Sequence, residues 1–513
     1  MWRSPGLAPL LACLLFAAPA VATQRAAAQV ELEIRVIDRD TNQLIPVRMH
    51  LRDGRGRPVI PPDVISWHDH FIVPGVAVLQ LRAGEYTFEM ERGPEYRLRT
   101  GHFSAERGDA DNVQVEMQRF AHLKEQGWWS GDLHVRRDPE EMPLVLQAED
   151  LHVAPVISWD HQQNPWQDQR LPEAPLVRVD RDRFFHRLGG SDARAGGNLL
   201  YLNLPQPLRF YEAEPEFPAS STVLLQTDAH PSVHVDIERP FWWDLPVWVA
   251  SQRVDSIGLC NGHMQRDGML NNEAWGKPRE RLTFPDPHGN GLWSQHIYYQ
   301  LLETGVRIPP SAGSASGQLS NPVGYNRVYV HCGDQLDYDA WWENLRAGRV
   351  VVTNGPLISD PRVNGQLPGH VFHAAAGETV TLHAALNLAT RDPLDYLEVI
   401  KNGQVEHEVR LDEWAREGGE LPEVVFEESG WMLIRAVTAH PRTYRFASTG
   451  PYYVQIGGER RISRQAAQFF LDWVHERARR VDLADPDQRA TVLRYHRAAR
   501  DFWQRVLDAA NAD

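Results

Sequence analysis

The pattern of apolar residues changes three times along the 513-residue chain, and this constrains the fold most. Residues 29–118 alternate apolar and polar positions, as in "VELEIRVID", which predicts the short strands of a β-sandwich. Residues 119–356 alternate apolar strands with helical stretches, which predicts an α/β layer or barrel. Residues 357–457 return to a period of two and predict a second β-sandwich, and residues 458–513 have the spacing of a helical tail.

Local signals place individual elements inside these regions. Asn402-Gly403 between two apolar runs indicates a hairpin, Gly305 is typical of a helix end, and Asp485 before Pro486 is typical of a helix start. In the central region we expect strands within residues 152–159, 197–204, 232–238, 254–261 and 305–313, and helices within residues 139–151 and 292–305.

The ends and the charge of the chain limit where it works and what it binds. Residues 1–28 are typical of a secretory signal, with Arg3 before an apolar run and small residues at the expected cleavage site. No later segment has the ~20 apolar residues that cross a bilayer, so we expect a secreted or periplasmic protein. Lipoprotein anchoring through Cys13 is not expected, because the apolar run before it is very short. The net charge of -15 argues against nucleic-acid binding.

Polar residues gather at the ends of the expected central strands. His134, His161, Glu238, His263 and Ser314 all lie at or just after such ends, where α/β folds place their working residues. The stretch "SGDLHVR" carries Asp132 and His134 and then Arg136. Metal-dependent hydrolases often place His-x-His at a strand end, so the arginine stands where a second ligand is expected. An arginine stays protonated and cannot bind a cation.

The central region resembles the PHP superfamily of metal-dependent hydrolases, and within it the exported CehA/McbA-like group. The resemblance rests on "SGDLHV", "HVAPVISWDH" and "GYNRVYVH…W…LRAGRVVVTNGPL…VNGQLPG", and it covers nearly the whole mature chain. It implies a distorted (β/α)7 barrel flanked by two β-sandwiches. It also implies a cluster of His, Asp and Glu side chains that holds up to three cations, which activate water against a phosphoester or another ester-like bond.

The ligand set that the resemblance implies is only partly present. His134 and the pair Asp160-His161 match the family pattern. Asp192 is a loose match for the bridging acid, and Glu238-Arg239 stands near the expected His-Pro. The closing Gly-Ser-Asp-x-His has become residues 313–317, "GSASG". A cluster of three cations is therefore not expected.

Three interpretations of this site remain open. One divalent ion, Zn or Mn, is held by His134, His161 and either Asp160 or Glu238, which gives an ester or phosphoester hydrolase. Alternatively, Arg136 and Arg239, oriented by Asp132 and Glu238, replace the cation and bind an anionic group. The chain is then a hydrolase or a non-catalytic binding protein for a saccharide or an anionic ring compound. In the third interpretation Arg136 pairs with Glu238 in an inert scaffold.

Further residues near the same strand ends suit a ring-shaped small molecule. Trp129, Trp159 and Trp243 are candidate walls for such a ligand, although core packing is the alternative for each tryptophan. Asn261 and His263 could orient the ligand or transfer a proton, and Ser314 and Ser316 could form the floor. Other tryptophans near these ends are Trp128, Trp166, Trp242, Trp275 and Trp293.

The histidines of residues 68–70 and the two cysteines of the mature chain give weaker signals. His68-Asp69-His70 in the first sandwich is expected to be a surface pair, since a metal site needs three or four converging ligands. Cys260 and Cys332 are expected to be two small buried thiols, although a disulfide between them stays open.

Overall fold

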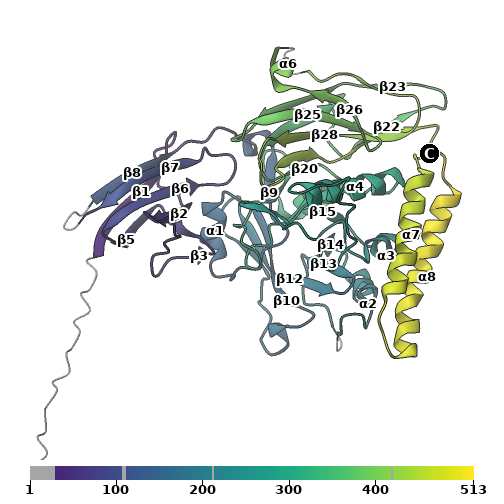
Figure 1. Cartoon of the computed structure of the whole chain (residues 1–513), viewed down its shortest axis with the longest axis horizontal. Helices are drawn as coiled ribbons and strands as arrows, with labels where there is room; N and C mark the ends of the chain where they lie inside the picture. The colour runs from purple at the N-terminus through teal and green to yellow at the C-terminus, as the bar shows by residue number, and fades with distance from the viewer. Residues whose placement is uncertain (1–28, 107–110, 211–212, 417–419) are drawn as a thin grey trace, which may run out of the picture.

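The computed structural model describes residues 29–106, 111–210, 213–416 and 420–513, so the expected signal segment lies outside the described residues. Figure 1 shows the first sandwich at one end, the mixed central region in the middle, a second β-region above it and two long helices along the far side. The protein is a mixed α/β molecule in which sheets predominate. In the described part of the chain, no helix is long and apolar enough to cross a membrane.

The N-terminal region is a β-sandwich of two sheets. Alternate residues of facing strands, such as Leu32, Met49 and Leu79, are buried between the sheets and form their own core. One sheet contains β5 (Val76–Arg82), β1 (Gln29–Asp38) and β8 (Asp111–Met117); the other contains β3 (Ser66–Trp67), β4 (His70–Val73), β2 (Val47–Asp53), β6 (Gly84–Glu91) and β7 (Arg99–Ala105).

The central region confirms all five expected strands and both expected helices. Its strands are β9 (Trp128–Gly131), β10 (Val153–Asp160), β11 (Leu176–Arg178), β12 (Phe184–Arg194), β13 (Gly197–Leu202), β14 (His234–Ile237), β15 (Ser256–Cys260), β16 (Met264–Gln265), β17 (Gly268–Met269) and β18 (Pro310–Ala312). Its helices are η1 (Lys124–Gln126), α1 (Met142–Ala148), η2 (Pro165–Gln167), α2 (Ser220–Leu224), η3 (Leu225–Ala229), α3 (Leu245–Ala250), α4 (Gly289–Glu303) and α5 (Tyr338–Arg346).

Strand β12 was not expected from the sequence. Its run "FFHRLGGSDAR" contains two glycines and three charged residues, which hide the apolar signal. The glycines serve packing, because a Cβ atom on Gly190 would lie 2.0 Å from the ring of Trp159. The ring of Trp159 thus packs directly on the backbone of Gly190. Strand β12 pairs in parallel with β10 and antiparallel with β13.

Hydrogen bonds on both sides of residues 132–136 hold the site-bearing segment in place. Val135 forms an isolated parallel bridge with Val156 on one side and with Ser316 on the other. The backbone N–H of Leu133 donates to the carbonyl of Ala312 at 3.0 Å. The strands of the described chain follow the order β18-β15-β14-β13-β12-β10-β9 without a closed ring, and this segment links the two ends of that row.

The second β-region shares its sheet with the central region. The order continues from β9 through β19, β20, β29, β28, β25 and β26, so no sheet boundary separates the two. Asn402 and Gly403 make the expected hairpin turn, both with positive φ. β19 (Arg327–His331) and β20 (Val350–Thr353) still belong to the central residues. The strands of the second region are β21 (Leu357–Val363), β22 (Val371–Ala374), β23 (Val380–Leu382), β24 (Ala384–Ala389), β25 (Leu394–Lys401), β26 (Gln404–Val409), β27 (Val424–Phe426), β28 (Gly430–Thr438), β29 (Phe446–Thr449) and β30 (Tyr452–Ile456), with helix α6 (Leu411–Arg416).

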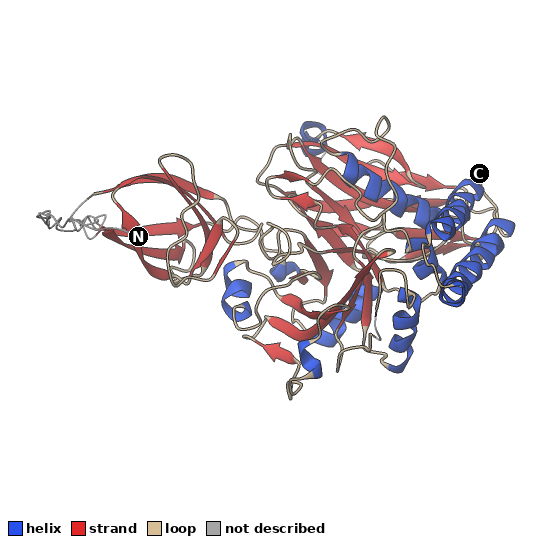
Figure 2. Cartoon of the chain, turned by 60° about the horizontal axis from the view of Figure 1, so that its bottom comes forward, coloured by secondary structure: helices blue, strands red, loops and turns tan. Residues whose placement is uncertain are grey.

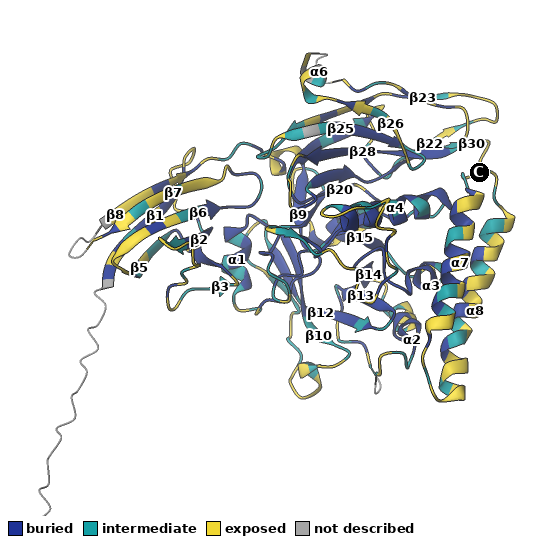
Figure 3. Cartoon of the chain, in the orientation of Figure 1, coloured by how far each residue is buried: buried dark blue, intermediate teal, exposed yellow. Residues whose placement is uncertain are grey.

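The helical tail consists of α7 (Arg464–Arg480) and α8 (Pro486–Asp508), which lie side by side (Figure 2). The side chain of Asp485 accepts hydrogen bonds from the first turn of α8, as the sequence predicts. Trp473 and Trp503 point into the large central core, while the outer faces of both helices are exposed (Figure 3). The aromatic stripes of the tail are therefore packing faces.

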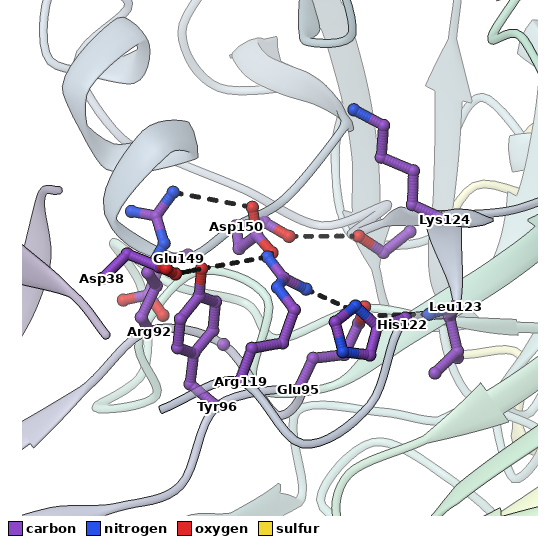
Figure 4. A network of polar contacts seen from close by, with 12 residues as sticks. Asp38, Arg92, Glu95, Tyr96, Arg119, His122, Leu123, Lys124, Glu149 and Asp150 are labelled. Atoms are coloured by element: carbon purple, nitrogen blue, oxygen red, sulfur yellow. Dashed lines mark hydrogen bonds and ion pairs between the residues drawn. The ribbon is translucent and has the colours of Figure 1, made fainter. Parts of the chain in front are cut away.

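A buried ionic network joins the first sandwich to the central region (Figure 4). Arg119 contacts Asp150 at 2.5 Å and Glu95 at 3.0 Å, and Arg92 lies 3.7 Å from Asp150. The hydroxyl of Tyr96 donates to Asp38 at 2.8 Å. Because these charges are largely removed from water, the sandwich is held in a defined position on the central region.

Candidate functional site

The expected site residues lie at neighbouring strand ends of the central sheet. His134 follows β9, and His161 follows β10, which is the parallel neighbour of β9. Glu238 and Arg239 follow β14, and Asn261 and His263 follow β15. These residues therefore lie at one edge of the sheet, which we call the mouth.

His134 and Glu238 form the deepest contact of the mouth. Their side chains are almost fully buried, and Nδ1 of His134 lies 3.2 Å from Oε1 of Glu238 without the alignment of a hydrogen bond. Arg239 lies 2.8 Å from the same carboxylate oxygen and stacks against the ring of Trp242. Burial opposes the charged form of Glu238, but Arg239 and His134 outweigh it and hold the pKa of this carboxyl well below its ordinary value.

Asn198 and Ser191 complete this cluster, although the sequence analysis does not single them out. The amide of Asn198 donates to Oε2 of Glu238 at 3.2 Å, and the hydroxyl of Ser191 donates to the amide oxygen of Asn198 at 2.7 Å. Both residues belong to the antiparallel pair β12–β13. No motif carries this signal, since Ser191 sits in a strand that the apolar pattern conceals.

Arg136 pairs with Asp160 and not with Glu238, so the pairing expected for an inert scaffold is wrong. The guanidinium of Arg136 donates to Asp160 at 3.3 Å, and their side chains are 20% and 24% exposed. Glu238 is instead engaged by Arg239, its neighbour in the chain. His161 lies beside this outer pair, and partial burial lowers the pKa of its imidazole.

Asp132 does not orient an arginine. Its carboxylate accepts backbone N–H groups from His134, Ser314 and Gly324 at 3.0, 2.9 and 2.7 Å. The side chain is fully buried, and burial raises the pKa of this carboxyl above its ordinary value. Asp132 therefore fastens the segment that carries His134 to the loops after β18.

The mouth does not offer the geometry that a metal ion requires. His134, His161, Glu238 and His263 each have a buried side-chain atom without a hydrogen-bond partner among the described residues, which suits potential ligands. Ligands of one zinc ion lie about 2 Å from it and hence within about 4 Å of one another. In the described part of the chain, no three His, Cys, Asp or Glu donors of the mouth approach that closely.

Gly317 stands where the resemblance implies a closing histidine, and its backbone leaves no room for a side chain. Its φ is +90°, and a Cβ atom there would lie 2.0 Å from the backbone oxygen of Arg136. A histidine at this position would therefore collide with the segment that carries Arg136. The loop after β18 is built for close backbone packing, and Arg136 donates its own N–H to Ser316 at 2.7 Å.

The tryptophans expected to line the mouth are mostly core residues. Trp129 and Trp159 are buried, and each indole N–H donates to a backbone carbonyl. Trp243 packs edge-on against Trp473 of α7 and under Arg480. Trp128, Trp242 and Trp293 are also buried, whereas Trp275 is 71% exposed. The expectation that these tryptophans form the walls of a ligand site is therefore wrong, because the large rings fill the space between sheet and helices.

Of the remaining expected residues, Asn261 and Ser314 bond to the backbone, whereas His263 and Ser316 each keep an unpartnered atom in the described part of the chain. Asn261 bonds to the backbone of Gly258 and His263, and Ser314 bonds to the backbone of Asn326. His263 contacts the carbonyl of Asn272 through Nε2 at 2.8 Å, and burial lowers its pKa well below the ordinary value. The hydroxyl of Ser316 is buried without a partner in the described residues.

The donor groups that are close enough to hold a metal ion lie elsewhere, in the first sandwich. Within the described ranges they are His50, Asp69 and His70, and His50 with Glu89 and Glu91. The expectation that His68 and His70 form a surface pair is therefore wrong, because His68 is exposed while His70 is buried beside His50. Cys260 and Cys332 are both free.

No protein-family model matches the chain, and no curated protein matches it significantly. Among solved structures, the Bacillus anthracis TIE protein is 21% identical over 22% of this chain and 20% of its own, with a TM-score of 0.15. A streptococcal ancillary pilin is 15% identical over 22% of this chain and 38% of its own, with a TM-score of 0.17. The Parabacteroides merdae β-glucuronidase with glycerol in its active site is 10% identical over 81% of this chain and 60% of its own, also at 0.17. At these TM-scores the likeness carries no argument about function.

Proposed function

We propose that this chain is a PHP-like protein of the exported CehA/McbA type whose mouth binds an anionic small molecule through arginines in place of a metal cluster. The quoted motifs support the family, and the hydrogen bonds on both sides of residues 132–136 support a distorted seven-stranded barrel. Export remains a prediction from residues 1–28.

One observation carries the anion site. Arg136 and Arg239 stand at strand ends where the family places ligands, and the Nε of each is buried without a partner among the described residues. Each guanidinium gives one nitrogen to a carboxylate, so further donors remain for a carboxylate, sulfate or phosphate group. Arg136 and Asp160 are the solvent-accessible part, and His134 lies deeper. A saccharide or ring compound with an anionic substituent is the expected ligand class.

Anion titrations on the full chain test this proposal. Inorganic phosphate and sulfate are titrated into chelator-treated protein by calorimetry, with a carboxylate-bearing sugar acid as a third probe. We expect binding of at least one of these without metal, weakened about tenfold or more in Arg136→Gln, since a charge-assisted contact contributes about 1.5–3 kcal/mol. Arg253→Gln is the matched control, because Arg253 also pairs with a carboxylate but precedes β15 at the opposite strand end.

The control decides whether the effect belongs to the mouth. Equal weakening by both substitutions would show that only overall charge matters. Absence of binding by all three probes would contradict the anion site.

A single-metal ester or phosphoester hydrolase is the second candidate, favoured by the unpartnered donor atoms of His134 and Glu238. The donors of the mouth do not fit an ion as they stand. Zn or Mn analysis and hydrolysis of chromogenic esters and phosphoesters separate the candidates. Metal that is lost in His134→Ala together with activity would favour the hydrolase and replace the anion proposal.

A further inference from the structure

Two buried histidines of the first sandwich, His50 and His70, lie next to the carboxylate of Asp69. His50 lies on β2 and His70 begins β4, and these strands pair antiparallel with Met49 opposite Phe71. The two imidazoles consequently meet, with ring centroids 5.2 Å apart. Asp69 sits in the turn between β3 and β4, and its Oδ1 lies 3.2 Å from Nδ1 of His50 and 3.6 Å from Nδ1 of His70.

Ring nitrogens of both histidines have no aligned hydrogen bond within the described residues. His50 and His70 are 4% and 3% exposed. Both ring nitrogens of His50 and Nδ1 of His70 are buried without a hydrogen bond to any described residue. One ligand atom from each of His50, Asp69 and His70 lies within 4.8 Å of the other two. Buried polar atoms are nearly always satisfied in proteins, so this group is incomplete as it stands.

We propose that His50, Asp69 and His70 bind one divalent transition-metal ion of the zinc type. Two imidazoles and a carboxylate are a donor set that such ions accept, and a fourth position is left for water. Glu89 lies on β6 opposite His50 and pairs with Arg266. Its side chain is partly exposed, which gives the ion a path from solvent.

Neighbouring arginines do not close the site. Arg48 is held by Glu91 at 2.9 Å and by Glu149 at 2.7 Å. Arg52 contacts the other oxygen of Asp69, Oδ2, at 3.0 Å, which leaves Oδ1 turned toward the histidines. The positive charges near the proposed ion are therefore largely neutralised by carboxylates.

The proposed ion would brace the sandwich against the mouth. The β3–β4 hairpin touches the central region through the indole of Trp67, which donates to the carbonyl of Leu319 at 2.8 Å. Arg137 donates to the carbonyl of Ser66 at 3.0 Å. Both contacts reach the segments that carry Arg136 and Ser316. An ion that ties this hairpin to β2 would thus fix one wall of the junction.

Zinc binding by the full chain tests the proposal. Chelator-treated protein is titrated with Zn²⁺ alone, and bound metal and the thermal midpoint are measured. We expect one ion per chain and a higher midpoint in the wild type. Affinity should fall by more than about tenfold in His70→Gln, as loss of even a supporting contact does at metal sites. His102→Gln is the matched control, because His102 is exposed on β7 of the same sandwich.

One further variant keeps the test decisive. His70→Cys retains a ligand, and with Co²⁺ it should show a sulfur-to-metal charge-transfer band that the wild type lacks. Because this band reports a thiolate at position 70, it separates this site from the mouth. The proposal is overturned if the chain binds no zinc, if His70→Gln binds it as the wild type does, or if His70→Cys gives no such band.

Discussion

Replacing Asp132 by asparagine tests whether this buried carboxylate stabilises the backbone of the site or takes part in anion binding. In the wild type Oδ1 accepts two backbone N–H groups and Oδ2 accepts the N–H of Gly324 at 2.7 Å. Asparagine keeps one oxygen for the first two bonds. Its amide nitrogen then faces the N–H of Gly324, so a donor meets a donor.

The magnitude follows from these contacts. A hydrogen bond to a charged group contributes about 1.5–3 kcal/mol, and a neutral one about 0.5–1.5 kcal/mol. Asp132→Asn loses one such bond and weakens two. The loss is partly offset because burial disfavours the charged carboxylate and raises its pKa in the wild type. We expect the free energy of unfolding to fall by about 2–4 kcal/mol.

Guanidinium chloride unfolding, followed by tryptophan fluorescence, measures this change. Anion affinity, measured on the folded variant, should stay within about twofold of the wild type if Asp132 only fastens the segment. A variant that is as stable as the wild type but fails to bind the anion would show instead that Asp132 belongs to the binding site.

Three other changes probe the same structure. Arg136→Gln should cost less than about 1 kcal/mol of unfolding free energy in denaturant, since its pair with Asp160 is partly exposed. The buried guanidinium of Arg477 contacts the carboxylates of Glu216 at 2.5 Å and Asp244 at 2.6 Å. Arg477→Met leaves both carboxylates unpaired and should lower the free energy of unfolding by about 3–5 kcal/mol in the same assay; an unchanged midpoint would contradict this. Burial lowers the pKa of His186 to about 4, so this residue should contribute a loss of up to about 3 kcal/mol of unfolding free energy as the pH falls from 6.5 to 4. The stability of His186→Gln should therefore fall less steeply than that of the wild type, and parallel pH profiles would contradict this.

Much of the secondary structure was predictable because its signals are local. Asp485 caps α8, Gly305 follows α4, and Asn402 with Gly403 turns the β25–β26 hairpin, as each residue's own conformational preference dictates. The apolar runs also place most central strands, and therefore the edge where His134 lies. These effects act over a few residues, and no tertiary partner is needed to see them.

The partners at the site were decided by tertiary structure alone. Nothing near Arg136 in the sequence indicates that it pairs with Asp160 while Glu238 goes to Arg239. The meeting of His50 with His70 depends on the register of β2 against β4. Contacts between distant residues depend on how strands align, and a shift of one residue would turn each side chain to the opposite face. Local patterns therefore identify residues that can act at a strand end, whereas the alignment of strands in the folded sheet selects the residues that meet.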